Sequence, residues 1–122
     1  VMARTTVDQL LDAARARLQR VEPVEAQAAI AAGALLVDVR SDSQRERDGV
    51  VPGSMFIPRN VLEWRFDPSN DARLPTADYG LQVIVVCQEG YTSSLAAAAL
   101  QEIGINRATD VIGGYAAWRE LL

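Results

Sequence analysis

A single cysteine, Cys87, is the residue in this chain best placed to do chemistry. The apolar run 81–86 precedes it and predicts a buried strand, and an alanine-rich stretch at about 94–103 predicts a helix after it. Main-chain N–H groups and the helix dipole can favour a thiolate at such a junction. Free cysteines also behave as small buried hydrophobes, so a reactive thiol and a structural one are both open interpretations.

The missing residue types narrow the chemistry. The chain has no histidine and no lysine, and all 12 of its basic residues are arginines. These absences exclude Cys–His and Ser–His pairs, Schiff bases and Walker-type phosphate loops. One cysteine without histidine cannot form a structural zinc site, and we expect no metal and no cofactor. An activated nucleophile must therefore depend on backbone dipoles, arginines and hydroxyl groups.

Length and charge indicate the broad class. With 122 residues, 49% hydrophobic and 23% charged, the chain is typical of one globular domain. Its net charge of −4 and the lack of a basic cluster argue against nucleic-acid binding. No apolar stretch approaches the roughly 20 residues of a membrane span, and no signal-peptide pattern is present. A lone cysteine gives no sign of an oxidising compartment, so we expect a cytoplasmic location and no membrane partner.

Residues 1–20 predict an amphipathic N-terminal helix. Thr6 can cap this helix, and its apolar side chains recur at helical spacing at Val7, Leu10, Leu11, Ala14 and Leu18. We interpret the segment as a packing helix that precedes the main domain. A second helix is expected from Pro23 to residue 32, where Gly33 would end it.

Strands and helices alternate over residues 21–122, which we expect to form one domain. After an extended link at 21–22, the expected strands are 34–39, 55–57, 81–86 and 108–112. A short helix or loop is expected at 41–48, a brief helix within 58–65, and a closing helix up to Leu122. This alternation predicts an α/β fold with a mostly parallel sheet of about five short strands and helices on both faces. Ligands of such sheets bind at the carboxyl ends of strands, where Cys87 lies.

Three motifs stand in order along the chain. The first is the strand end Asp38-Val39-Arg40 followed by the turn Gly49-Val50-Val51-Pro52-Gly53 and by Ile57-Pro58. The second is Cys87, which opens a six-residue loop through Thr92 after a hydrophobic strand and before a helix. The third is Gly113-Gly114-Tyr115-Ala116-Ala117-Trp118. Together, these three motifs resemble the rhodanese family of single-domain sulfurtransferases. The resemblance covers nearly all of the chain from about Val21 onward.

The resemblance implies that Cys87 carries sulfur as a persulfide. Its thiolate would take a sulfane sulfur from thiosulfate or a persulfide donor and pass it to a thiol, a protein acceptor or another nucleophile. The inward N–H groups of the loop would stabilise the anion. We expect the active-site loop to comprise Gln88, Glu89, Gly90, Tyr91, Thr92 and Ser93. The hydroxyls of Thr92 and Ser93 either donate to the sulfur or cap the following helix.

Other residues are expected to support the structure or to bind substrate. Asp38, Gly113, Gly114 and Trp118 are expected to be structural, and Trp64 is expected in the core or at its rim. Arg59 and Arg65 are candidates for binding substrate charge, or else are surface arginines. Arg40 either holds neighbouring loops or lines the pocket.

Departures from the family pattern leave alternatives open. The resemblance implies basic residues after the cysteine in thiosulfate-using members, whereas Gln88 and Glu89 stand here. A carboxylate near the entrance would repel thiosulfate and oppose thiol ionisation unless it faces solvent or pairs with an arginine such as Arg59. Val50 replaces a histidine of the first motif. A related phosphatase loop would need an arginine where Ser93 stands. A rhodanese-fold binding or sensing module remains the second interpretation.

Overall fold

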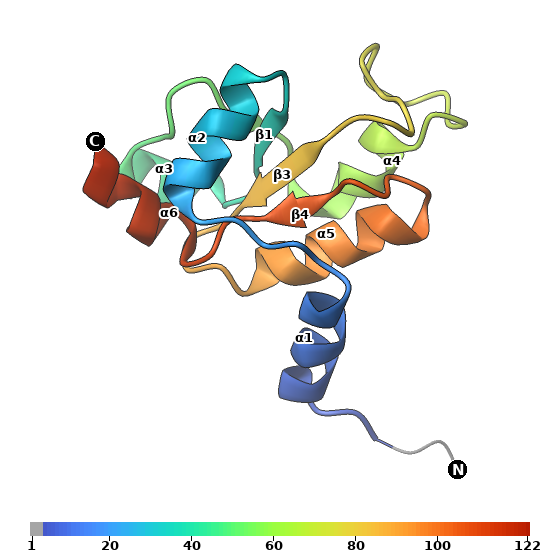
Figure 1. Ribbon diagram of the computed structural model, residues 1–122, viewed down its shortest axis with the longest axis horizontal. Helices are drawn as coiled ribbons and strands as arrows, with labels where there is room; N and C mark the ends of the chain where they lie inside the picture. Colours follow the sequence, from blue (N-terminus) through green and yellow to red (C-terminus); the bar gives the residue numbers. More distant parts are fainter. Residues whose placement is uncertain (1–3) are drawn as a thin grey trace.

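The chain folds around a small parallel sheet that helices cover on both faces (Figure 1). The computed structural model describes residues 4–122. The sheet contains β1 (Leu35–Asp38), β2 (Met55–Phe56), β3 (Val83–Val86) and β4 (Thr109–Asp110), in the order β2-β1-β3-β4. The predicted α/β class is confirmed. The strands are shorter than predicted, and residues 4–122 contain four of them, close to the expected number of about five. Val21 in the extended link adds an isolated parallel bridge to Val111.

The register of the strands brings their carboxyl ends to one edge. Asp38 pairs with Phe56 on one side and Val86 on the other, and Val85 pairs with Asp110. All of these pairings are parallel. The segments that follow the four strands therefore leave the sheet at the same edge, and the segment after β3 begins with Cys87.

Two hydrophobic clusters fill the spaces above and below the sheet. On one face, α4 (Leu62–Phe66) and α5 (Thr92–Glu102) contribute Leu62, Phe66, Ala96, Ala97 and Leu100. On the other face, α2 (Pro23–Ala31) and α6 (Gly114–Trp118) contribute Ala26, Tyr115 and Trp118. The strand residues alternate between the two clusters, as expected for a sheet that is covered on both faces.

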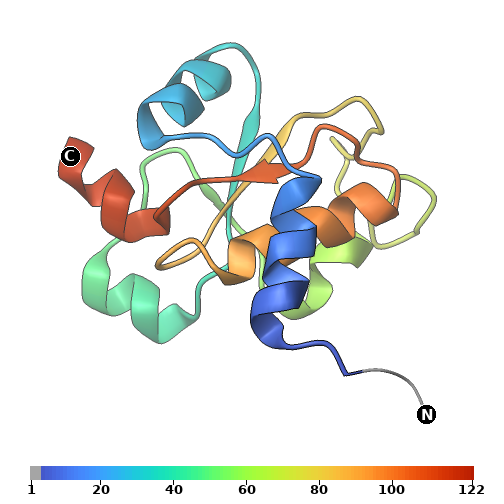
Figure 2. The ribbon, with the colours of Figure 1, turned by 60° about the horizontal axis from the view of Figure 1, so that its bottom comes forward.

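The N-terminal helix α1 (Val7–Ala16) lies against α5, outside the sheet layers (Figure 2). Thr6 caps it as predicted, in a capping box with Gln9. Only Ala14 is fully buried within α1, and Leu18 packs against the first cluster. Val7 and Leu10 are exposed, so the apolar face is less covered than a packing helix implied. The division at residue 20 stays a prediction, and residues 1–3 lie outside the described part.

Local signals explain most of the remaining elements. The polar segment after β1 is a helix, α3 (Asp42–Asp48), because Ser41 and Gln44 form a capping box. Residues 58–65 contain the 3₁₀ helix η1 (Arg59–Val61) and most of α4. The closing segment is α6 followed by η2 (Arg119–Leu121). Trp118 is buried, but Trp64 is 54% exposed and is not a core residue. None of the helices within residues 4–122 combines the length and the apolarity that a membrane crossing needs.

Helix α4 allows a matched test of the core. Phe66 is fully buried and Trp64 is largely exposed on the same helix. We expect Phe66→Ala to lower the free energy of unfolding by about 3–5 kcal/mol, because it removes a buried ring and leaves a cavity. Trp64→Ala should cost less than about 1 kcal/mol. Urea unfolding followed by circular dichroism measures both, and equal losses would contradict the core described above.

Candidate active site

Cys87 lies at the floor of a pocket at the carboxyl edge of the sheet. The pocket has a volume of about 360 Å³, and Cys87 is 6% exposed. Its walls come from the end of β1, from α3 and from the loop that Cys87 opens: Val39, Arg40, Gln44, Cys87, Gln88, Glu89, Tyr91 and Thr92. Gln44 is a wall residue that the sequence did not indicate, since only the packing of α3 brings it there.

Two main-chain N–H groups donate to the sulfur of Cys87. The distance to Sγ is 3.2 Å from the nitrogen of Gly90 and 3.4 Å from that of Ser93. The N-terminus of α5 begins at Thr92, and its dipole adds positive potential at the same place. Amide donors around a sulfur favour its anion, whether this is a thiolate or a terminal persulfide.

The carbonyl groups of the loop have partners outside it. Tyr115 N–H donates to the Cys87 carbonyl at 2.8 Å, and Ala116 N–H donates to the Gln88 carbonyl at 3.0 Å. Both donors lie in the first turn of α6. The C=O and N–H of a trans peptide point in opposite directions, so these bonds turn the N–H groups of residues 88 and 89 away from α6.

Two glycines allow α6 to lie this close to the loop. Gly90 has φ +87°, and a Cβ there would lie 2.8 Å from the nitrogen of Gly113. Gly114 has φ +60°, and its Cβ would lie 2.5 Å from the Cys87 carbonyl oxygen. A side chain at either position is excluded by both backbone conformation and space. These contacts are the physical reason for the glycines in the second and third motifs.

The hydroxyls of Ser93 and Ser94 donate to a buried carboxylate and not to the sulfur. Ser93 Oγ donates to Asp110 at 2.7 Å, and Ser94 Oγ donates to the same carboxylate oxygen at 2.8 Å. Thr92 is the first residue of α5, whose N-cap is Tyr91 and has no side-chain capping bond. Neither expected hydroxyl role is therefore seen for Thr92 or Ser93, and Ser93 reaches the sulfur through its main chain.

Arg40 has a fully buried side chain and holds several segments together. It donates to both carboxylate oxygens of Asp38, to the Gly49 carbonyl at 2.8 Å and to Gln88 Oε1 at 3.2 Å. The ring of Tyr115 lies under its guanidinium, 4.1 Å away. These contacts place Arg40 in the pocket wall as a support, with its charge neutralised by Asp38.

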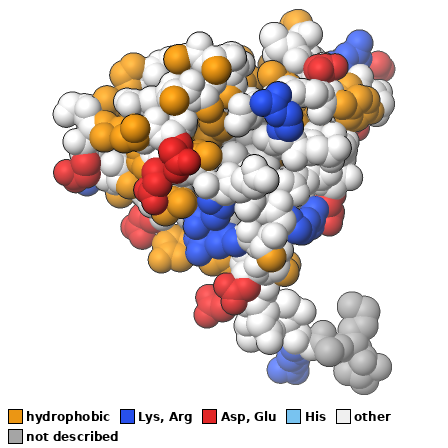
Figure 3. All heavy atoms as spheres, viewed as in Figure 1, with side chains coloured by type: hydrophobic (Ala, Val, Ile, Leu, Met, Phe, Trp, Pro, Cys, Tyr) orange, Lys and Arg blue, Asp and Glu red, His pale blue; other side chains and the backbone are white. Residues whose placement is uncertain are grey.

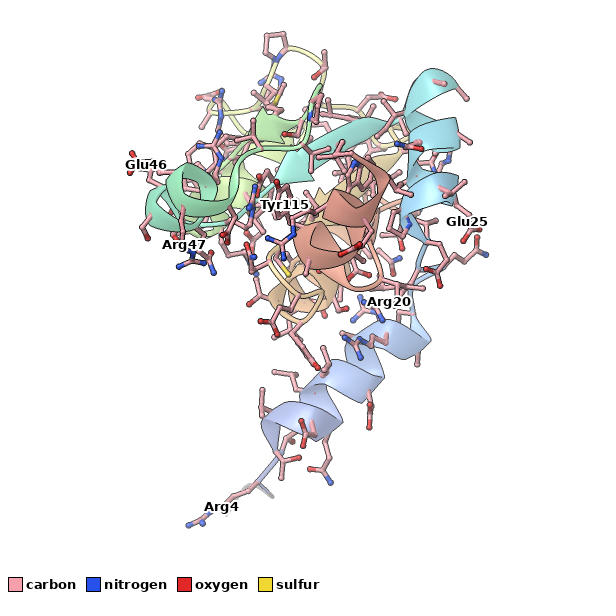
Figure 4. All side chains as sticks on the ribbon, turned by 90° about the vertical axis from the view of Figure 1, so that its left-hand side faces the viewer. Arg4, Arg20, Glu25, Glu46, Arg47 and Tyr115 are labelled. Atoms are coloured by element: carbon pink, nitrogen blue, oxygen red, sulfur yellow. The ribbon has the colours of Figure 1, made fainter. Side chains whose placement is uncertain are left out.

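The two residues after the cysteine have different surroundings. Gln88 is fixed between Arg40 and Asp48, to which its amide donates at 3.0 Å. A hydrogen bond from Arg47 lowers the pKa of Asp48, with a smaller contribution from Gln88. Glu89 is exposed at the pocket rim and makes no ion pair with any residue of 4–122. Figure 4 shows Arg47 on α3.

Arg59 and Arg65 lie outside the pocket lining. Arg59 pairs with Glu63 one turn further along, at 2.7 Å, rather than with Glu89. Arg65 donates to the Ala72 carbonyl in the connection that follows α4. The structure therefore does not bring these two substrate-binding candidates to Cys87.

Sequence reasoning missed the groups behind the loop. Asp110 is fully buried and pairs with Arg20 at 2.9 Å. Arg20 and Arg15 both donate to the Gly90 carbonyl, at 3.0 and 2.8 Å. The two arginines precede Gly90 by 70 and 75 residues, and no local pattern links them to it.

In this chain, one thiol accepts hydrogen bonds from main-chain amides at the carboxyl edge of a parallel sheet. This arrangement places the protein among the α/β domains whose site is a loop that begins with a cysteine. The Rhodanese-like domain profile matches residues 22–121, and the chain belongs to this family. The predicted family membership is thereby confirmed.

Curated relatives carry sulfurtransferase names. The chain is 33% identical over 101 residues to the thiosulfate sulfurtransferase GlpE of Pseudomonas savastanoi pv. phaseolicola, covering 83% of this chain and 87% of that protein. It is 37% identical over 84 residues to the maize adenylyltransferase and sulfurtransferase MOCS3-1. That match covers 69% of this chain but only 18% of the maize protein, so the chain spans less than a fifth of its length.

A solved structure resembles the whole fold, including the N-terminal helix region. It is a Rhodopseudomonas palustris protein of unknown function, described as a possible tyrosine phosphatase, with a TM-score of 0.85 and 29% identity. The similarity covers 99% of this chain and 96% of that one.

The buried Asp38–Arg40 pair gives a stability prediction. Arg40→Met would leave the Asp38 carboxylate buried without its main partner, and we expect a loss of about 3–5 kcal/mol in the free energy of unfolding. Arg59→Met removes a partly exposed ion pair and should cost at most about 1 kcal/mol. Urea titration of the two variants tests the difference, and an Arg40→Met protein as stable as the parent would refute the supporting role.

Proposed function

We propose that this protein is a sulfurtransferase that carries a sulfane sulfur on Cys87. The observation that carries this proposal is the geometry of Sγ, which accepts hydrogen bonds from two loop amides at the floor of an open pocket. The named relatives support the same chemistry. The absence of a histidine from the sequence is compatible with it, because an ionised thiol needs no base.

Two displacements at sulfur complete the reaction. The Cys87 thiolate attacks the outer sulfur of a donor such as thiosulfate, the S–S bond of the donor breaks, and sulfite leaves with the bonding pair. The terminal sulfur of the persulfide is then attacked by an acceptor thiolate or cyanide, and Cys87 leaves as a thiolate. The chain has one cysteine, so it offers no second thiol to take the sulfur.

The pocket wall favours a donor with less negative charge than thiosulfate. Among the described residues that line it, the charged side chains are Glu89, which is exposed, and Arg40, which forms a buried ion pair with Asp38. A dianion approaching this rim meets a carboxylate without a nearby ion-pair partner. We therefore propose a low-molecular-weight or protein persulfide as the preferred donor, a thiol or protein as the acceptor, and the reducing cytoplasm as the location.

Two other functions have specific support. The acidic rim also suits a binding or sensing module whose cysteine does not turn over. The similarity to a possible tyrosine phosphatase suggests phosphate-ester hydrolysis. In the position of the phosphate-clamping arginine, however, this chain has Ser93, whose hydroxyl donates to Asp110. A phosphatase would thus lack its main charge stabilisation.

Sulfur loading can be observed directly by mass. Incubation with thiosulfate or a glutathione persulfide should give a protein heavier by one sulfur atom, and cyanide should remove this atom as thiocyanate. The Cys87→Ser protein should gain nothing. If no donor loads Cys87 while the protein hydrolyses an aryl phosphate, the phosphatase interpretation replaces ours. If neither reaction occurs, the interpretation as a binding or sensing module replaces ours.

The acidic rim gives a prediction of donor preference. We expect Glu89→Arg to raise kcat/KM for thiosulfate about tenfold, because it replaces repulsion by attraction of a dianion. Glu120→Arg is the matched control, because Glu120 is exposed and lies outside the pocket. This substitution changes the net charge of the protein as much as Glu89→Arg does, but it leaves the pocket rim unchanged. Equal effects of both substitutions would show that overall charge, and not Glu89, controls the rate.

A further inference from the structure

Two arginines from outside the family-matched region converge on one carbonyl of the cysteine loop. Arg15 Nη2 donates to the Gly90 carbonyl at 2.8 Å, and Arg20 Nη2 donates to the same oxygen at 3.0 Å. Arg15 is in the last turn of α1, and Arg20 is in the link that follows. The family match begins at residue 22, so both arginines precede the matched region.

Each arginine is held in place by a second contact. Arg20 forms a two-pronged ion pair with buried Asp110, at 2.9 and 3.2 Å. Arg15 Nε donates to Ser94 Oγ at 3.1 Å, and its guanidinium lies 5.5 Å from the centre of the Tyr91 ring. Figure 4 shows Arg20 where α1 meets the body of the domain, and Figure 3 shows basic side chains gathered at that junction.

The bonded carbonyl belongs to the peptide that joins Gly90 to Tyr91. Its oxygen faces the arginines, so the planar peptide directs the N–H of Tyr91 to the opposite side. The same glycine uses its own N–H to donate to Cys87 Sγ. The two peptides meet at the Cα of Gly90, so the arginines restrain the backbone dihedrals of the residue whose N–H contacts the sulfur.

The arginines also place positive charge behind a loop that has none of its own. Arg15 and Arg20 bring two positive charges against the one negative charge of Asp110, and Arg15 has no carboxylate partner within residues 4–122. The other charged groups around the loop come from its rim, from β1 and from α3: Glu89, Asp38 with Arg40 and Arg45, and Asp48 with Arg47. Asp38 and its two arginines lie on the β1 side of the loop, whereas Arg15 and Arg20 supply the positive charge at the Gly90 carbonyl.

We propose that Arg15 and Arg20 are positioning residues of the active site, which hold the Gly90 carbonyl outward and favour the anionic sulfur of Cys87. The N-terminal segment then supplies from behind the loop the positive charge that the loop sequence lacks. The inference rests on the proposed sulfur chemistry for its purpose, but it concerns the reactivity of the thiol itself.

The test is the pH profile of Cys87 alkylation by iodoacetamide, which requires no sulfur donor. In Arg15→Gln and Arg20→Gln we expect the midpoint of the profile to move to higher pH by about half a unit or more. Arg15→Lys keeps the charge, so the midpoint of its profile should stay close to that of the parent protein. The control is Arg17→Gln, because Arg17 lies between the two but contacts Glu102 and the Ala98 carbonyl on α5.

The outcomes separate positioning from simple anchoring of α1. Thermal unfolding of each variant shows whether the fold is kept, and Arg15→Gln is decisive because it leaves no buried carboxylate unpaired. A parental pH profile for folded Arg15→Gln, or an equal shift in Arg17→Gln, would overturn the proposal. A shifted profile in a protein that no donor can load would support the positioning role while refuting sulfur transfer.

Discussion

Three main-chain carbonyl groups of the cysteine loop accept hydrogen bonds from residues outside the loop, and these bonds fix the conformation of the loop. The first turn of α6 binds the carbonyls of Cys87 and Gln88, and two N-terminal arginines bind that of Gly90. Because each peptide is planar, these bonds orient the N–H groups of residues 88, 89 and 91, which lie on either side of the Gly90 N–H that donates to the sulfur. A short loop forms too few internal hydrogen bonds to stabilise this conformation by itself. The conformation therefore depends on the hydrogen bonds that the surrounding elements donate.

Two buried ion pairs support the loop from either side in the same manner. Asp38 and Asp110 are the last residues of β1 and β4, the two neighbours of β3. Each carboxylate binds an arginine that continues to an oxygen of the loop: Arg40 reaches Gln88 Oε1 and Arg20 reaches the Gly90 carbonyl. Buried pairs give little net stability compared with apolar packing. Their value here lies in the fixed direction of the donors that they present.

The sequence predicted what depends on local pattern. Apolar runs located the strands, capping residues located α1, and the motifs identified Cys87 and its loop. What it missed depends on tertiary contacts. Nothing in the spacing of Arg15 and Arg20 indicates that they meet Gly90, and Arg59 could not be known to pair with Glu63 before α4 was seen. Ser93 was identified as a loop residue, but its hydroxyl points to Asp110 because a buried carboxylate requires donors.

The placement of charge separates two demands that a sulfur carrier makes on its loop. Stabilising the anion on Cys87 requires positive electrostatic potential near the sulfur. Arginines in the pocket and arginines behind the loop can both supply this potential. Selecting the donor depends on the charge that an incoming molecule meets at the rim, where Glu89 is exposed. Arginines within the loop sequence would stabilise the sulfur anion, but they would also attract any anionic donor to the entrance. In the mechanism that we propose, positive charge in the N-terminal segment activates the thiol while the entrance stays acidic, and the acidic entrance selects persulfide donors over small dianions.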